Sequence, residues 1–225
     1  MSTPVLLSWS GGKDAAWALY ELQQRDDIEV VALLSTLTEG YERSSMQGVR
    51  REVLQAQAAA AAVPLLEAWI PQACDNAIYL QRMNAALAEA QRHWPGLSTI
   101  AFGDLLLQDI RAWREQQYAA QGWSTLFPLF GRDTTALARQ MIRQGLQAHL
   151  CCVDSTLLDA EFSGHAFDNT LIDQLPADID ACGENGEFHT CVSAGPMFLA
   201  PLQLEQGDTV LRDSRYAYTD FSLRS

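Results

Sequence analysis

The stretch 5-VLLSWSGGKDAAWALYEL-22 joins a short apolar run to a helical pattern through two glycines, a lysine and an aspartate. Such a run followed by helical spacing predicts a buried strand leading into a helix. Glycines let a ligand approach the backbone, and free N–H groups at a helix N-terminus attract an anion. Ser10, Gly11 and Gly12 can supply an anion site, with Lys13 adding charge. The alternative is an ordinary tight strand-to-helix turn.

Two common phosphate-binding motifs do not fit this stretch. The P-loop, G-x-x-x-x-G-K-[ST], needs a glycine where Leu7 stands and a hydroxyl where Asp14 stands. The dinucleotide motif, G-x-G-x-x-G, fails because Gly11 and Gly12 are adjacent and no third glycine follows in the helix. The stretch matches neither motif. It keeps the two features that both motifs share, glycines that expose the backbone and a helix N-terminus.

Extended and helical runs alternate over the first two thirds of the chain. This alternation implies right-handed βαβ units, hence an α/β fold with a doubly wound parallel sheet covered on both faces. Ligands of such sheets bind beyond the carboxyl ends of the strands. We expect strands at Val5–Trp9, Ile28–Leu37, Pro64–Ile70, Ser98–Asp104, Thr125–Phe130 and Ala148–Val153. We expect helices at Asp14–Arg25, Val49–Ala62, Asn76–Trp94, Asp109–Gln121 and Thr135–Gly145.

The pattern changes after about Asp154. Short polar turns follow, then a helix at Asp168–Leu175 and a strand-rich tail with turns at 195-GP-196 and 207-GD-208. We therefore expect an α/β domain at 1–154 and a smaller C-terminal strand-containing region at 155–225.

Composition narrows the class of protein. The 225 residues are 48% hydrophobic, enough for a full core, and the net charge of −13 argues against a nucleic-acid partner. The N-terminus lacks the basic region of a signal peptide, and no run reaches the ~18 apolar residues of a membrane span. The five cysteines are an odd count and predict reduced thiols. A cytoplasmic protein is expected.

The segment 182-CGENGEFHTC-191 is dense in reactive side chains. It carries Glu184, Glu187 and His189 between two cysteines. A zinc site is disfavoured because C-x₈-C with one internal histidine matches no usual ligand spacing, and neither does 151-CC-152. By itself the segment is most simply an acidic turn entering a strand.

The glycine stretch nevertheless resembles a known family. 10-SGGKDA-15 is similar to the PP-loop, S-G-G-x-D-S, of the ATP pyrophosphatases. The resemblance implies a sheet of strand order 3-2-1-4-5, a loop backbone that holds the pyrophosphate part of ATP, and an aspartate, Asp14, that helps bind magnesium. Ala15 departs from the motif, since it lacks the family's hydroxyl.

A second resemblance narrows the family. 182-CGENGEFHT-190 resembles the G-E-G-G-E-[FY]-E-T segment of the diphthine-ammonia ligases, which lies in the acceptor-binding half, and 103-GDLLLQDIRAWRE-115 resembles their G-D-x-x-x-x-D-x-R-x-W-R-E stretch. The similarity spans roughly residues 5 to 200. Asn185 and His189 depart from the family pattern, where glycine and glutamate stand, so the acceptor stays open. The composition favours a bacterial branch of the family.

The resemblance and the strand ends together select the candidate site residues. Asp104 follows the fourth expected strand and either binds magnesium, orients a nucleophile or caps the next helix. Met46 lies against the base or fills the core. The expected nucleotide contacts are Ser8, Ser10, Gly11, Gly12, Lys13, Asp14, Ala15, Ser35 and Met46, with Asp14 also the metal ligand. The expected catalytic residues are Asp104, Glu184, Glu187 and His189.

The following helix carries three further side chains of interest. Trp113 is expected in the core, whereas Arg111 and Arg114 either hold an anionic group of the substrate or lie on a solvated face.

The expected activity is that of an amide-forming ligase. ATP would adenylate a carboxylate on a small molecule or protein, releasing pyrophosphate, and ammonia would then displace AMP. No glutaminase motif is present, so the ammonia would be free or come from a partner. Self-association, if it occurs, would give a homodimer. The alternative is a non-catalytic adenine-nucleotide sensor of the same fold, which Ala15 favours.

Overall fold

A parallel sheet forms the centre of the first half of the molecule. The computed structural model describes residues 2–45 and 47–224. The parallel strands run in the order β4-β2-β1-β5-β6, which confirms the expected order 3-2-1-4-5. Their bounds are β1 (Thr3–Ser8), β2 (Ile28–Thr38), β4 (Leu65–Ile70), β5 (Thr99–Ala101) and β6 (Ser124–Leu126), and the short β3 (Arg43–Ser44) pairs antiparallel with β2.

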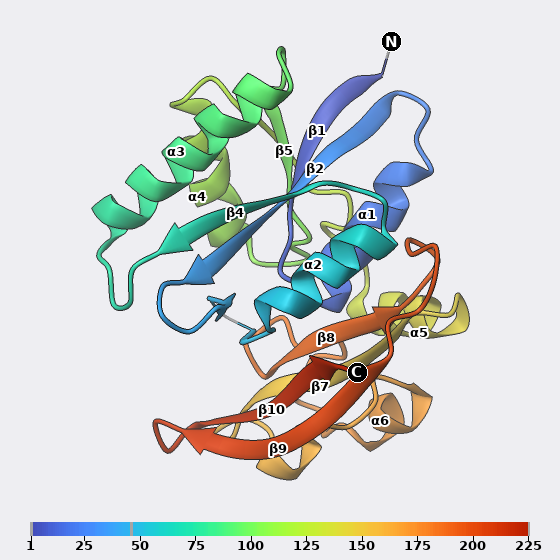
Figure 1. Ribbon diagram of the computed structural model, residues 1–225. Helices are drawn as coiled ribbons and strands as arrows, with labels where there is room; N and C mark the ends of the chain where they lie inside the picture. Colours follow the sequence, from blue (N-terminus) through green and yellow to red (C-terminus); the bar gives the residue numbers. More distant parts are fainter. Residues whose placement is uncertain (1, 46, 225) are drawn as a thin grey trace.

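Helices cover both faces of this sheet, as Figure 1 shows. Successive residues of β1 point to opposite faces, so Val5 and Leu7 enter one apolar core while Leu6 enters the other. The first core contains buried side chains of α1 (Lys13–Gln23) and α2 (Arg51–Ala60), and the second contains those of α3 (Asn76–His93) and α4 (Gln108–Ala119). The fold is therefore doubly wound, as the alternating pattern predicted.

A separate antiparallel sheet forms the C-terminal part. Its strand order is β8-β7-β10-β9. The bounds are β7 (Gln147–Asp154), β8 (Phe188–Ala194), β9 (Leu204–Arg212) and β10 (Tyr216–Leu223), accompanied by α5 (Thr134–Arg143), the 3-10 helix η1 (Ala160–Phe162) and α6 (Asn169–Gln174). The prediction that 148–153 continues the parallel sheet is wrong, because β7 pairs antiparallel with β8 and β10. A domain boundary near residue 154 stays a prediction.

The last hairpin corrects a predicted turn. Gly207 and Asp208 lie inside β9, close to the register shift that separates Thr219 from Phe221 on the paired strand. The chain turns instead at Asp213 and Ser214, which both have a φ of 50°. Positive φ at two central residues is the geometry that matches the twist of a tight hairpin.

The two parts meet along the outer edge of β8. Val192 on β8 donates its N–H to the carbonyl of Gly11, 3.0 Å away. Figure 1 shows the antiparallel sheet lying beneath the C-terminal ends of the parallel strands. The glycine loop thus covers a strand edge that would otherwise expose unpaired backbone groups. No helix of the described residues is long and apolar enough to cross a membrane.

Candidate nucleotide site

The glycine loop has the conformation that its sequence requires. Gly11 has a φ of +81°, and a Cβ there would lie 2.7 Å from Cδ2 of Leu54 on α2. Only glycine combines this backbone angle with such close packing. Gly12 is the N-cap of α1 and provides no side-chain cap; its own N–H donates to Oγ of Ser10, 3.2 Å away. The predicted loop residues therefore gather at the end of β1, beside Ser8.

Strand β8 holds the start of α1 from the other side. The N–H of Lys13 donates to Oγ1 of Thr190 at 3.0 Å, and a Cβ on Gly12 would lie 3.1 Å from the Thr190 carbonyl oxygen. Thr190 directly follows His189 but was not predicted as a site residue. Its position on β8 makes the C-terminal segment part of the wall around the loop.

Lys13 faces the protein interior. Its side chain is 2% exposed, pairs with Asp14 at 2.9 Å, and donates to the carbonyl of Cys182. The ammonium also lies 5.5 Å from the ring centroid of Phe188. Burial opposes the charge of Lys13. Asp14, Cys182 and Glu184 nevertheless raise the pKa of Lys13 above its ordinary value, so the side chain stays a cation. The lysine thus links the loop to the 182–188 segment.

Glu184 lies near enough to Asp14, in the first turn of α1, for their charges to interact. Oδ1 of Asp14 is buried and has no hydrogen-bond partner among the described residues. Burial, helped by the charge of Asp14, raises the pKa of Glu184 to about 7. Oε2 of Glu184 accepts the N–H of Leu105 at 3.1 Å, so residues from both parts of the chain share this place. With this pKa, Glu184 can exchange a proton near neutral pH.

Gly103 makes this arrangement possible. A Cβ at Gly103 would lie 2.7 Å from the backbone carbon of Asp14 and 2.9 Å from the nitrogen of Ala15. The loop after β5 therefore contacts the first turn of α1 backbone to backbone. Gly103 was not predicted as a site residue, because no local sequence pattern indicates its close contact with α1.

Asp104 forms an ion pair with α4. Its Oδ2 lies 2.7 Å from Nε of Arg114, and the helix is capped by Leu107, so Asp104 is not the N-cap. Its predicted contact with magnesium or substrate stays a prediction. The prediction that Trp113 lies in the core is wrong, since this residue is 37% exposed. Arg111 pairs with Glu115 at 2.8 Å.

Three further predicted site residues are Glu187, Ser35 and Met46. Both carboxylate oxygens of Glu187 accept hydrogen bonds within their own turn, from the backbone and side chain of Asn185 and from the backbone of Asp180. Ser35 is fully buried and donates to the Trp9 carbonyl at 2.7 Å. Met46 lies outside the described residues.

His189 belongs to a row that crosses the antiparallel sheet. It pairs with Cys152, Cys152 pairs with Tyr218, and Tyr218 pairs with Val210. Directly paired residues share a face of the sheet, whereas Thr190 points to the other face. Burial, together with the charge of Lys13, lowers the pKa of His189 to about 4, so the imidazole is neutral at pH 7.

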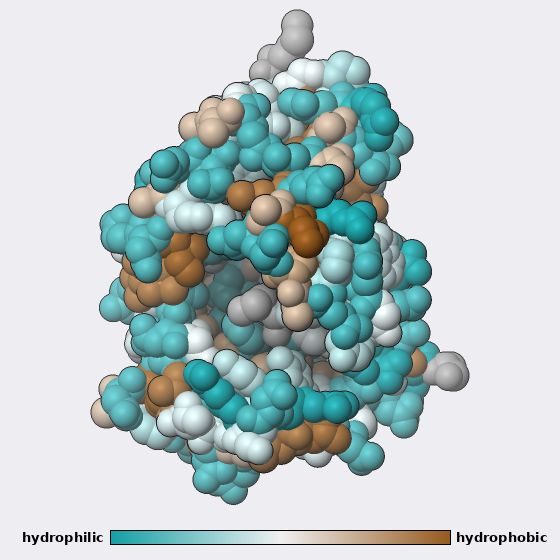
Figure 2. Space-filling model, turned by 90° about the vertical axis from the view of Figure 1, so that its left-hand side faces the viewer, coloured by the Kyte–Doolittle hydropathy of each residue, from teal (hydrophilic) through white to brown (hydrophobic). Residues whose placement is uncertain are grey.

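A large cleft opens on the same side as this row. Its volume is about 810 Å³, and Figure 2 shows this face of the molecule hollowed between the upper and lower parts. Tyr218 and Val210 line one wall, and the chain after β2 and β4 lines the other. The lining residues are Thr38, Tyr41, Arg43, Ser44, Ser45, Gly48, Gln72, Ala73, Asp208, Val210, Arg212, Asp213, Tyr218, Thr219 and Asp220.

One lining segment of the cleft continues along the chain to a contact with the glycine loop. Val49 follows the cleft residue Gly48. Its Cγ1 atom would lie 3.4 Å from a Cβ on Gly11. The volume is in the range of pockets for drug-sized ligands.

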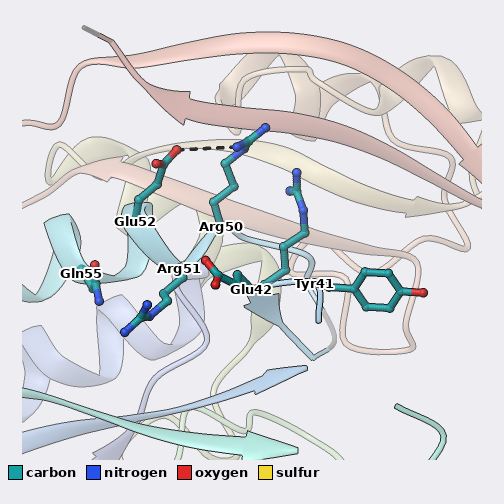
Figure 3. Close-up of a pocket in the computed structure, with 7 residues that line it drawn as sticks. Tyr41, Glu42, Arg50, Arg51, Glu52 and Gln55 are labelled. Atoms are coloured by element: carbon teal, nitrogen blue, oxygen red, sulfur yellow. Dashed lines mark ion pairs between the residues drawn. The ribbon is translucent and has the colours of Figure 1, made fainter. Parts of the chain in front are cut away.

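A smaller hollow of about 340 Å³ lies at the start of α2. Figure 3 shows Arg50 and Arg51 there pointing in different directions. Arg50 pairs with Asp220 and Arg51 with Glu67, at 2.5 and 2.8 Å. Since carboxylates already neutralise these arginines, the hollow does not favour an anion.

The fold and the loop define a class of ATP-binding protein, the PP-loop ATP pyrophosphatases. The family model described as the diphthamide synthase N-terminal domain matches residues 1–121, and that of the diphthamide synthase C-terminal domain matches residues 133–218. The chain belongs to the diphthamide synthase family, and this membership supports ATP binding and an enzyme of the ligase type. No curated protein matches the chain.

Proposed function

We propose that the protein is an ATP-dependent ligase that adenylates a carboxylate and converts it to an amide with ammonia. The observation that carries the proposal is the position of Glu184, which accepts the Leu105 N–H from the loop that packs on the backbone of Asp14 and lies near enough to Asp14 for their charges to interact. One group comes from the phosphate-binding loop and the other from the segment assigned to the acceptor. Adenylation of the carboxylate and its reaction with ammonia can therefore occur at one place.

ATP would place its phosphates on the loop and its adenosine in the 810 Å³ cleft. The loop supplies backbone N–H groups and a helix N-terminus, which favour phosphate. The cleft begins at the end of β2, where Thr38 and Ser45 offer hydroxyl groups, and Tyr218 on the opposite wall offers an aromatic ring. These groups suit a ribose and a base better than they suit phosphate.

Asp14 fits the role of a magnesium ligand. Oδ1 of Asp14 has no partner among the described residues, and a carboxylate oxygen is the type of ligand that magnesium prefers. Among the same residues no group of three or more His, Cys, Asp and Glu side chains is gathered to hold a metal. Phosphate oxygens of ATP would then complete the coordination. Magnesium would neutralise charge on the departing pyrophosphate.

The proposed reaction has two steps. A carboxylate oxygen of the acceptor attacks the α-phosphorus of ATP, and the bond to pyrophosphate breaks. Ammonia then attacks the acyl carbon, and AMP leaves with the former carboxylate oxygen. Positioning and electrostatic stabilisation by the loop account for most of the catalysis in such transfers.

Glu184 is the best placed group to accept the proton that ammonia loses. Its pKa of about 7 leaves a substantial carboxylate fraction at neutral pH while keeping it an effective base. Glu187 is engaged within its turn, so we assign it to holding the 180–187 segment in place. His189, on the face of the cleft, would contact the acceptor or the nucleotide as a neutral imidazole.

The second candidate function is nucleotide sensing without catalysis. Ala15 supports it, because the missing hydroxyl removes one phosphate contact of the family. Glu184 opposes it, since a buried carboxyl whose pKa is raised to about 7 is typical of catalytic sites.

Release of AMP and pyrophosphate distinguishes the two functions. The protein is incubated with ATP, magnesium, ammonium and a panel of carboxylic acids, and both products are quantified. We expect acceptor-dependent release in wild type and none in Asp14→Asn, which should still bind ATP but lose the magnesium dependence of binding. The matched control is Asp26→Asn, an exposed aspartate beyond the end of α1. ATP binding with no release for any acid would favour the sensor.

A further inference from the structure

Gln57 on α2 is a buried side chain that the proposed reaction does not use. It is fully buried, and all three of its hydrogen bonds go to other elements. Oε1 accepts the indole N–H of Trp9 at 3.1 Å. Nε2 donates to the carbonyl of Gly11 at 3.0 Å and to the carbonyl of Val192 at 2.7 Å. One amide therefore joins the strand end, the glycine loop and β8.

The chemistry of the partners fixes the orientation of this amide. An indole N–H can only donate, so it must face the amide oxygen, and the two carbonyls can only accept, so they must face the amide nitrogen. Glutamate has the same shape but would place a carboxylate against two carbonyl oxygens. Glutamine is the side chain of this shape that satisfies all three groups.

The bond to Gly11 determines where the next N–H points. The described peptide bonds are all trans. The carbonyl of Gly11 and the N–H of Gly12 belong to one such planar unit and point in opposite directions. Gln57 and the Val192 N–H both hold that carbonyl on the side of α2 and β8. The N–H of Gly12 is thereby directed to the other side, toward Ser10.

Glycine alone would not maintain this orientation. Gly11 and Gly12 are free to adopt many backbone angles, so the peptide between them can rotate unless neighbours restrain it. A rotated peptide would present the Gly11 carbonyl oxygen to the ligand and repel a phosphate. We propose that Gln57 is a positioning residue that keeps the Gly12 N–H turned toward the pyrophosphate part of ATP. The inference rests on the proposed ATP-binding function.

Two variants and a matched control test the role. Gln57→Glu keeps the shape and loses both donors, whereas Gln57→Met keeps the approximate volume and loses every hydrogen bond. Gln55→Met on the same helix is the control, since Gln55 is exposed and donates to Glu67 of β4 rather than to the loop. Calorimetric titrations with magnesium pyrophosphate and with adenosine separate the two parts of the site, and thermal unfolding reports the fold.

We expect both Gln57 variants to lose at least about tenfold in pyrophosphate affinity, the effect of one hydrogen bond to a charged group, while adenosine affinity stays unchanged. Unchanged pyrophosphate affinity in a folded variant would overturn the role. Equal losses for the two probes would also overturn it, because they indicate general disruption. Wild type that binds adenosine but no pyrophosphate or ATP would instead refute the proposed function together with this inference.

A measurement on wild type makes the test independent of variant folding. In protein with isotope-labelled glycine, the Gly12 amide resonance should shift on addition of magnesium pyrophosphate, whereas that of Gly207, within β9 on the C-terminal sheet, should not. A Gly12 resonance that stays in place while pyrophosphate binds would overturn the inference.

Discussion

At the scale of single residues, the chemistry of the site depends on the surroundings of Glu184. Its ordinary pKa of 4.5 would make it a weak base at neutral pH. Burial and the neighbouring Asp14 raise that pKa to about 7, because both disfavour the charged form. The same shift makes the folded protein less stable as Glu184 ionises.

This linkage predicts a pH dependence of stability. Between pH 4.5 and about 7 the unfolded chain releases the Glu184 proton while the folded protein keeps it, so this contribution to stability falls as pH rises. Glu184→Gln has no such proton. We expect the variant to gain stability relative to wild type between pH 5 and pH 8, measured by urea unfolding. Glu161→Gln, an exposed control, should follow wild type. A difference between Glu184→Gln and wild type that does not change with pH would contradict the assignment.

At the scale of elements, the loop after β5 and the first turn of α1 act as one unit. Gly103 lets their backbones touch, and this contact brings Leu105 to Glu184 and Glu184 to Asp14. A side chain at this position would meet backbone atoms, which cannot rotate away. The distance between the two elements, and with it the site, therefore depends on one missing Cβ.

Gly103→Ala should accordingly separate these elements. We expect it to lower the free energy of unfolding by about 1–3 kcal/mol, as for other overpacked positions, and to weaken ATP binding. Gly207→Ala is the control, because a Cβ there would lie 3.4 Å from Cβ of Asp220, an ordinary contact. Urea unfolding and ATP titration of both variants provide the comparison. Similar effects in the two would show that the tight contact has no special cost.

At the scale of the whole molecule, a carboxylate on β10 ties the two sheets together. Asp220 pairs with Arg43 of β3 at 2.8 Å and with Arg50 at the start of α2 at 2.5 Å. Hydrogen bonds from Arg50 and Arg43 hold the pKa of Asp220 well below its ordinary value of 3.8. Arg43 and Asp220 line the cleft, so their pairing also joins its two walls.

Asp220→Asn should loosen this connection. We expect it to lower the free energy of unfolding by about 1.5–3 kcal/mol at pH 7, the range for hydrogen bonds to charged groups. Because the pKa of Asp220 is lowered, the stabilisation is present above pH 3.8 and is lost as the pH falls further. Urea unfolding at pH 7 and pH 3 measures both effects.

The matched control is Asp173→Asn. Its partner Arg139 lies 2.6 Å away on the surface, and 64% of the Asp173 side chain is exposed. Such exposed pairs contribute about 0–1 kcal/mol. A loss in Asp220→Asn no larger than in this control would show that the two sheets are held by other contacts.

Local structure and the class of protein could be predicted from the amino-acid sequence. The alternation of apolar runs predicted the helices and the parallel strands, since each depends on a period of a few residues. The glycine loop could be predicted because its motif consists of consecutive residues. The family followed from two short motifs, 10-SGGKDA-15 and 182-CGENGEFHT-190, that the family comparison confirms.

The contacts between residues far apart in the chain could not be predicted and became visible in the folded structure. Periodicity does not indicate which sheet a strand joins, so β7 was assigned to the wrong one. The contacts of Thr190, Gly103 and Gln57 with the loop join residues far apart in the sequence, and no local pattern encodes them. The pKa of Glu184 likewise arises from burial and from a charge that lies on another element, and both exist only once the chain has folded.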